Sequence, residues 1–315
     1  MPSAAPFAGP QALPGLTVLE RGWLSSNNIV LHGGPGEGAT LVDSGHSVHA
    51  EQTLALLRHA LRGEPLARIV NTHLHSDHCG GNAALQRAFD VPVTVPAGVW
   101  SDVQGRDEDA LSYQATGQRC ERFSAQVMLA AGDTLQVGAR RWQALAAPGH
   151  DPDSLVLFDP ADGVLISADA LWENGFGVVF PELEGIAAFD EVAATLDLIE
   201  RLPVRVVIPG HGAPFGDVAG ALRRARTRLA GQRANPARHA HHGAKVLIKY
   251  HLMEEGSLAW PALLRWASDT PLFVAVWRRF GPRDAATAAD WCDALVAELA
   301  GSGALNVRDG VVHDA

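Results

Sequence analysis

The sequence has 315 residues, of which 47% are apolar and 19% charged, a composition typical of a soluble globular protein with material for about two domains. It has no apolar run long enough to span a bilayer and no basic, apolar leader, so we expect neither a membrane span nor a secretory signal. Its three cysteines are widely spaced and form neither a disulfide framework nor a zinc-finger pattern, so we expect a cytoplasmic protein.

Charge is distributed unevenly along the chain. Counting Lys and Arg against Asp and Glu, the net charge is −14 over residues 1–220 and +4 over residues 221–315. Such asymmetry can mark a nucleic-acid-binding half, but no dense block of basic residues is present, so we interpret it as two solvated surfaces of opposite sign. A nucleic-acid partner is therefore not our first expectation.

The first 220 residues alternate short β-branched or leucine-rich runs with helical patterns, the order of an α/β domain. The patterns predict strands at 16–21, 28–32, 39–43, 67–71, 91–95, 134–137, 141–147, 154–158, 164–167 and 204–208. They predict helices at 48–61, 80–89 and 187–201.

From about residue 219 the chain is predominantly helical. Helices are predicted at 221–232, 244–255 and 284–300, and Ser257 is a candidate cap of a helix with Pro261 in its first turn. Asp309-Gly310 between two apolar pairs predicts a terminal hairpin. Helices closed by a hairpin indicate a small winged-helix-like module. We therefore expect a flexible tail at 1–14, an α/β domain at 15–218 and a helical, winged-helix-like domain at 219–315.

A segment rich in metal-binding side chains follows the strand predicted at 67–71. Residues 71–81 read NTHLHSDHCGG. In an extended segment His73 and His75 project to the same side, so their imidazoles can converge on one ion. Asp77 and His78 face a neighbouring point as the chain turns into its helix. A surface histidine tract is the alternative, and it is disfavoured because this segment follows a strand far from either terminus.

Three further candidate ligands also follow predicted strands. His150 lies in PGHDPDS, Asp169 in SADA and His211 in PGHG. Loops at strand ends are where an α/β scaffold presents functional side chains. One histidine in such a loop is more often structural, but three sites in order indicate a metal centre.

In these motifs, and in Asp43 of LVDSG, the chain resembles the metallo-β-lactamase-fold hydrolases. The resemblance implies an αββα sandwich of two mixed sheets with helices outside. It implies that a first metal is bound by His73, His75 and His150, that a second is bound by Asp77, His78 and His211, and that Asp169 bridges them. Asp43 would orient a ligand or its loop without binding metal.

Such a centre is suited to hydrolysis. Two divalent ions that share a water lower its pKa toward neutrality and polarise the substrate, so a bridging hydroxide can attack without a serine or cysteine nucleophile. The resemblance also implies that Asp77 relays a proton to the leaving group. We expect a small thioester, lactone or ester as substrate. Zinc is the first expectation, and iron and manganese suit the same imidazole and carboxylate ligands.

Other activities of this fold stay open. A nuclease that cuts RNA is the main alternative, because some members with a winged-helix-like extension do so and because Arg223, Arg224, Arg226 and Arg228 could contact phosphates. The acidic first 220 residues would repel such a polyanion. An iron-dependent oxygenase or persulfide dioxygenase ranks lower, since both metal sites have their full ligand set. A β-lactamase also ranks lower, since the commonest zinc enzymes have a cysteine at the position of Asp169.

Large side chains follow Asp169 in a segment without regular pattern. We expect Trp172, Phe176 and Phe180 to wall an apolar substrate pocket, with ordinary packing against the sandwich as the alternative. The helical C-terminal module could also pack against a second subunit, so a homo-oligomer stays open.

Overall fold

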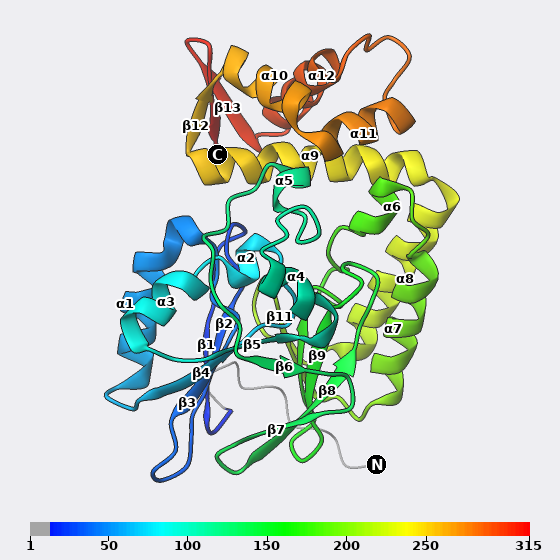
Figure 1. The fold of residues 1–315 in the computed structure, drawn as a ribbon. Coiled ribbons are helices and arrows are strands. Elements are labelled where there is room, and N and C mark those ends of the chain that lie inside the picture. Colours follow the sequence, from blue (N-terminus) through cyan, green and yellow to red (C-terminus); the bar gives the residue numbers. More distant parts are fainter. Residues whose placement is uncertain (1–12) are drawn as a thin grey trace.

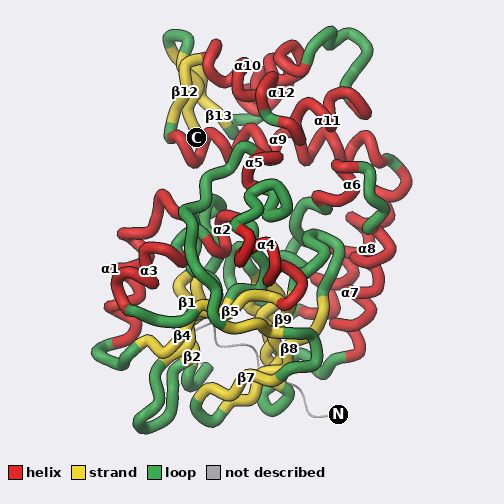
Figure 2. Tube along the Cα trace, in the orientation of Figure 1, coloured by secondary structure: helices red, strands yellow, loops and turns green. Residues whose placement is uncertain are grey.

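The computed structural model describes residues 13–315 and shows two β-sheets packed between outer helices, with a helical unit above one edge (Figures 1 and 2). The first sheet has six strands in sequential order: β1 (Leu16–Leu19), β2 (Asn28–Leu31), β3 (Ala39–Val42), β4 (Leu66–Val70), β5 (Val93–Pro96) and β6 (Val127–Leu129). Its first three strands are antiparallel, and β3 to β6 are parallel.

The second sheet has the order β11-β10-β9-β8-β7. Its strands are β7 (Thr134–Val137), β8 (Arg140–Ala146), β9 (Leu155–Asp159), β10 (Val164–Ala168) and β11 (Val206–Pro209). Only the β10–β11 pair is parallel, so this sheet is mixed as well. Between the two sheets lies an apolar cluster that includes Ile29, Val42, Trp142, Ile166 and Ile208.

Helices cover the outer face of each sheet. On the first sheet these are α1 (Ala50–Leu61) and α3 (Asn82–Phe89), and α1 buries Leu54, Leu57 and Leu61 at the spacing that the sequence predicts. On the second sheet they are α7 (Phe189–Arg201) and α8 (Val218–Ala234), which share one apolar cluster with its strands. The expected αββα sandwich is therefore confirmed.

Short helices occupy the loops at the edge of the sandwich. They are η2 (Ser47–His49), α2 (Ser76–Cys79), η3 (Ala97–Val99), α4 (Trp100–Gly105), α5 (Tyr113–Thr116) and α6 (Phe180–Glu184). The single helix predicted at 80–89 is thus preceded by a separate turn, α2, which carries part of the histidine motif. The sequence patterns did not predict α4, α5 or α6, because one or two helical turns leave no measurable periodicity.

The C-terminal unit consists of α9 (Pro236–Glu255), β12 (Ser257–Ala259), α10 (Trp260–Asp269), α11 (Pro271–Phe280), α12 (Ala288–Gly301), β13 (Leu305–Arg308) and β14 (Val311–Asp314). The predicted hairpin is β13–β14, and β12 pairs with β14 to give the sheet order β12-β14-β13. The helix predicted to have Pro261 in its first turn is present as α10, but it begins at Trp260, and Ser257, the predicted cap, begins β12 instead. The likeness to a winged helix stays a prediction.

The apolar clusters suggest where the C-terminal unit begins. Leu247, Phe273 and Trp291 belong to a cluster of the C-terminal unit, whereas Leu222 and Leu229 of α8 belong to the cluster of the second sheet. We therefore infer a domain boundary near Asn235, between α8 and α9, rather than at residue 219. The expected tail lies outside the described residues except for 13 and 14.

Helix α9 crosses between the sandwich and the rest of the C-terminal unit (Figure 1). Its Tyr250 hydroxyl lies 2.9 Å from the hydroxyl of Ser76, so α9 is in direct contact with the histidine motif. Among the described residues no helix is both long and apolar enough to cross a membrane. The cytoplasmic location stays a prediction.

Candidate metal centre

Three histidines from two loops bring their imidazole nitrogens together. His73 and His75 follow β4, and His150 follows β8. Nδ1 of His75 lies 3.2 Å from Nε2 of His73 and 2.8 Å from Nε2 of His150. Because Zn–N bonds are about 2.0–2.1 Å long, nitrogens at such separations can share one cation.

A second cluster adjoins the first. Asp77 and His78 lie on α2, Asp169 follows β10, and His211 follows β11. Oδ2 of Asp77 lies 3.0 Å from Nε2 of His211 and 3.7 Å from Nε2 of His78. The ligand atoms of all four residues lie within 4.8 Å of one another, and all four residues are buried.

Asp169 lies between the two clusters. Its Oδ2 is 3.3 Å from Nε2 of His150, and its Oδ1 is 3.5 Å from Nε2 of His78. A shift in the β10–β11 register between Ile166 and Ala168, where Ala168 has φ of 46°, turns the chain just before this residue. One carboxylate therefore faces both clusters, as a bridging ligand must.

Other groups hold the histidine rings in place. Nδ1 of His78 lies 2.7 Å from Oδ2 of Asp43, and Nδ1 of His150 donates to the carbonyl of Val178 at 2.5 Å. Each bond fixes a ring so that the opposite nitrogen, Nε2, faces the cluster. Asp43 itself does not join either cluster.

The donor set fits two divalent cations. Five imidazoles and two carboxylates converge, a combination that suits zinc, iron or manganese. Nε2 of His78 is fully buried beside Asp77 and Asp169, yet it has no hydrogen-bond partner in the described part of the chain. A buried nitrogen without a partner is unfavourable unless it binds a ligand such as a metal ion.

The protonation states favour metal binding. Burial lowers the pKa of His75 and His150 to about 4 and that of His73 well below its usual value, so these rings are neutral at pH 7. Burial opposes ionisation of Asp77, but His78 and His211 outweigh it and lower the pKa of Asp77 to about 2. Neutral imidazole and ionised carboxylate are the forms that bind metals.

The charge beside His78 acts in the opposite direction. Burial lowers the pKa of His78. The carboxylate of Asp43 opposes burial most strongly, and those of Asp77 and Asp169 add to it, so the pKa of His78 lies well above its usual value. Three negative groups around one imidazole therefore leave an excess of negative charge in the second cluster. A divalent cation would compensate that charge and displace the proton.

Two of the three expected wall residues lie beside the histidines. The ring of Phe180 is 5.0 Å from that of His75 and 5.6 Å from that of His150. Trp172 packs edge-on against His211 at 5.5 Å and donates from Nε1 to Oδ1 of Asp169 at 3.2 Å. The two aromatic rings thus border the first and second cluster respectively.

Phe176 does not join them. Its side chain is 1% exposed and belongs to the apolar cluster beneath α8, with the guanidinium of Arg228 over its ring. The loop bends between Trp172 and Phe180, so Phe176 packs against the sandwich instead of facing the histidines. Phe176 therefore occupies the position expected for ordinary packing against the sandwich, not the position of a pocket wall.

Sequence reasoning missed several residues around the centre. Trp23 stacks on the His211 ring at 5.5 Å, and Asp151 lies 3.9 Å from Nε2 of His75. Asp151 stands directly after His150, which was a usable signal. Trp23 and Tyr250 come from distant segments without any motif, so only the tertiary structure brings them to the site.

Comparisons with known proteins agree with this geometry. The sequence model of the family described as the Metallo-beta-lactamase superfamily matches residues 21–211, a range that contains all seven candidate ligands. A hydroxyacylglutathione hydrolase of Thermosynechococcus vestitus is 32% identical over 182 residues, which are 57% of this chain and 61% of that protein.

More distant matches extend the comparison. A linear primary-alkylsulfatase of Pseudomonas sp. is 26% identical over 234 residues, or 62% of this chain and 44% of that protein. The solved structure of TTHA1623 in a di-iron-bound form has a TM-score of 0.53 at 27% identity and covers 66% of this chain and 98% of that chain. The chain spans about half the length of the first curated relatives it matches. On the family match, which covers more than half of its residues, the chain belongs to the metallo-beta-lactamase superfamily.

Proposed function

We propose that the protein is a dinuclear metal-dependent hydrolase of a small thioester, with lactones and carboxylic esters as neighbouring substrate classes. The observation that carries this proposal is the position of Asp169, whose two oxygens face one histidine of each cluster at 3.3 and 3.5 Å. The hydroxyacylglutathione hydrolases among the relatives support a thioester as the first substrate to test.

The roles of the residues follow from their positions. One cation would be held by His73, His75 and His150, and the other by Asp77, His78 and His211. Asp169 would bind both cations. Bound there, two divalent cations lower the pKa of a shared water and polarise the substrate carbonyl. We propose zinc as the first metal to test, and iron as the next, because TTHA1623 was solved in a di-iron-bound form.

Asp77 is the proposed proton carrier. Its carboxylate is ionised at neutral pH, so the oxygen that does not bind the cation can accept a proton from the attacking water and pass it to the leaving group. Trp172 has a positioning role, because its Nε1–H holds Oδ1 of Asp169. With Phe180 it would also pack against an apolar acyl group and keep bulk water away.

The test combines metal analysis with a substrate panel on one preparation. We expect two divalent ions per chain and hydrolysis of a thioester, lactone or ester. Asp169→Ala should lose both activity and metal, whereas Asp197→Ala, which removes a half-exposed carboxylate of α7, should keep both. At most one ion per chain in an active, fully loaded preparation contradicts the dinuclear proposal.

The same panel separates the alternatives. Preferential cleavage of RNA identifies a nuclease, and a β-lactam as the best substrate identifies a lactamase. Oxygen consumption with a persulfide by an iron-containing preparation identifies a dioxygenase. Each of these results would replace the proposed thioester hydrolase.

A further inference from the structure

A cavity of about 680 Å³ lies between α8 and α9, and none of the candidate metal ligands lines it. Its volume is within the range of about 300–1,000 Å³ that is usual for small-molecule sites. The charged and titratable residues that line it are all basic: Arg223, Arg224, Arg228, Arg238, His239 and His242. No carboxylate is among its lining residues.

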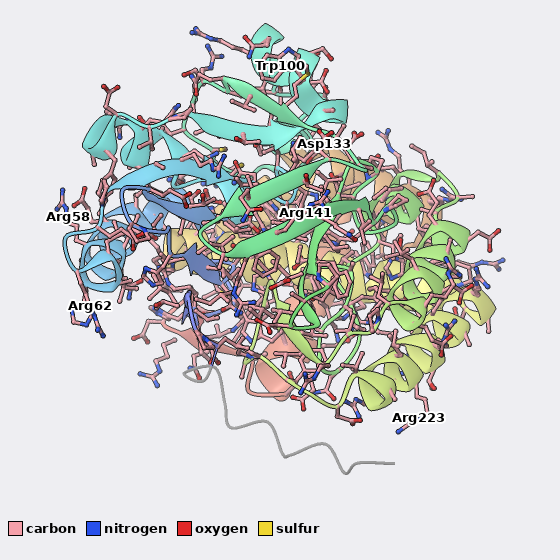
Figure 3. The ribbon with its side chains drawn as sticks, turned by 90° about the horizontal axis from the view of Figure 1, so that it is seen from below. Arg58, Arg62, Trp100, Asp133, Arg141 and Arg223 are labelled. Atoms are coloured by element: carbon pink, nitrogen blue, oxygen red, sulfur yellow. The ribbon has the colours of Figure 1, made fainter. Side chains whose placement is uncertain are left out.

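Most of these guanidinium groups have no acidic partner among residues 13–315. Arg224 pairs with Asp217 at 3.3 Å, but Arg223, Arg228 and Arg238 form no ion pair with the described residues. Figure 3 shows the Arg223 side chain extending outward from α8. Arg226 on the same helix does not line the cavity and pairs instead with acidic side chains of α7. Three guanidinium groups without an acidic partner among residues 13–315 therefore line one cavity. Phosphate is an anion that guanidinium groups bind well.

Two buried polar side chains of the cavity each have an acceptor atom without a donor among residues 13–315. His239 is 2% exposed and Gln232 is 8% exposed, and both line the cavity. Nε2 of His239 donates to the carbonyl of Val179 at 3.1 Å, which leaves Nδ1 as an acceptor without a donor. Oε1 of Gln232 is a second acceptor without a donor. Both atoms are almost fully enclosed, so a rotation of each side chain toward the cavity would be needed to expose them. The hydroxyl groups of a ligand would then supply the missing donors.

We propose that this cavity binds a small phosphate monoester that carries hydroxyl groups, such as a nucleoside monophosphate or a sugar phosphate. The guanidinium groups of Arg223, Arg228 and Arg238 bind the phosphate, and hydroxyl groups donate to Nδ1 of His239 and Oε1 of Gln232. RNA fits less well, because the unpaired basic groups line a single cavity while residues 1–220 have a net charge of −14.

The cavity adjoins the loop that orients two candidate metal ligands. On the cavity side, Nε of Arg224 donates to the carbonyl of Glu173 at 2.8 Å, and Arg228 lies over the Phe176 ring at 5.4 Å. On the other side, Trp172 bonds to Asp169 and the carbonyl of Val178 accepts from His150. The phosphate site therefore lies behind this loop, apart from the metal centre, and its binding does not depend on the proposed hydrolysis.

Calorimetric titration of the full-length, metal-loaded protein tests the proposal. The probes are adenosine monophosphate, glucose 6-phosphate, inorganic phosphate and adenosine. We expect one of the two esters to bind more tightly than inorganic phosphate and adenosine not to bind. The double variant Arg223→Gln/Arg238→Gln should weaken ester binding about tenfold or more, because two charge-assisted contacts are lost. The matched variant Arg226→Gln, on the same helix, should bind as the wild type does.

A second variant tests the hydroxyl contacts. Gln232→Leu keeps the shape of the side chain but removes the acceptor, so it should weaken the preferred ester and leave inorganic phosphate unchanged. A thermal melt verifies that this buried variant folds. If it does not fold, the exposed arginine variants still test whether the cavity binds the phosphate. The ester that binds more tightly shows whether the cavity prefers a nucleoside monophosphate or a sugar phosphate.

Four outcomes overturn the proposal. Neither ester binds at millimolar concentration. An ester binds but the arginine double variant does not weaken it, which places the ester outside this cavity. Inorganic phosphate binds as tightly as both esters, which excludes recognition of hydroxyl groups. Finally, a single-stranded RNA binds more tightly than the esters and loses affinity in the double variant, which makes the cavity part of a nucleic-acid surface.

Discussion

The carboxylate of Asp43 and the imidazole of His78 form a buried pair, with Oδ2 of the aspartate 2.7 Å from Nδ1 of the histidine. The same carboxylate accepts bonds from the backbone N–H of Thr72 at 2.9 Å and from its hydroxyl at 2.8 Å. Asp43 has φ of 57°, a conformation that aspartate and asparagine tolerate better than most residues. It thus connects the end of β3 to the loop after β4 and fixes the ring of a candidate ligand.

Asp43→Asn should weaken metal binding without unfolding the protein. Asparagine tolerates the positive φ, but it lacks the charge that holds the proton on Nδ1 of His78. We expect the affinity of the weaker-bound metal to fall about 10–100-fold, as is usual when the partner of a metal-binding histidine is removed. Competition against a chelator measures this. Asp90→Asn is the matched control, since Asp90 is exposed and has φ of 51°. Equal affinities in the two variants would show that Asp43 does not orient the ligand.

Trp172 and Phe176 should respond differently to truncation. Trp172 borders the second cluster, so Trp172→Ala should raise KM for the best substrate. Phe176 is 1% exposed in an apolar cluster, so Phe176→Ala should lower the free energy of unfolding by about 3–5 kcal/mol. Steady-state kinetics and denaturant unfolding measure the two effects. An unchanged KM in Trp172→Ala would exclude this residue from the substrate pocket.

Gly177 is a position where a methyl group should disturb the centre. A Cβ atom there would lie closer to Nδ1 of His150 than two such atoms can approach. Gly177→Ala should therefore displace the His150 ring and reduce the metal content. Gly301→Ala adds the same methyl group where no other atom lies within 4 Å, and it should leave the metal content unchanged. A fully metal-loaded Gly177→Ala protein would show that His150 is not needed as a ligand.

The sequence predicts the metal ligands better than their surroundings. His73, His75, Asp77 and His78 lie within six positions, so local strand and turn geometry suffices to bring them near one another. The other ligands each follow a strand, and strand order in the sandwich then brings those ends together. In contrast, Trp23 and Tyr250 reach the site only through the packing of distant segments, which no local pattern encodes.

Element boundaries show the same distinction. Strand β7 and the amphipathic helix α1 match their predicted positions closely, because alternation and helical periodicity are strong signals there. Helix α11 was not predicted, although Pro271 at its start is a usable signal. The prediction of a domain start at residue 219 relied on a change to helical pattern, but α8 packs against the second sheet, and packing is a tertiary property.

Glu254 is a buried carboxyl group next to the site, and it should make stability depend on pH. Its side chain is 1% exposed, and Oε1 accepts from the backbone N–H of Arg119 at 3.1 Å, while Oε2 has no hydrogen-bond partner within residues 13–315. Burial raises its pKa to about 7, against a smaller lowering by the charge and N–H of Arg119. His46, 3.9 Å away, does not compensate, because burial lowers its own pKa to about 4. The Nε atom of Arg119, whose side chain is mostly exposed, lies 3.6 Å from Oε1 of Glu254.

Since the pKa of Glu254 is higher in the folded than in the unfolded chain, the folded state binds the proton more tightly. Below the unfolded pKa of 4.5, Glu254 is protonated in both states and does not change the free energy of unfolding. As the pH rises from there toward about 7, Glu254 lowers the free energy of unfolding progressively. Above about pH 7 this destabilisation stays constant. Glu254→Gln removes the effect, so its Tm relative to wild type should increase between about pH 5 and about pH 8. Because His46 titrates in both proteins, its contribution cancels in the difference between the Tm of the variant and the Tm of the wild type. Glu121→Gln serves as the control: its exposed carboxyl group is bonded to Arg87 and has a lowered pKa, so its Tm difference should stay flat over that range. A flat difference for Glu254→Gln as well would mean that Glu254 is ionised in the folded protein throughout.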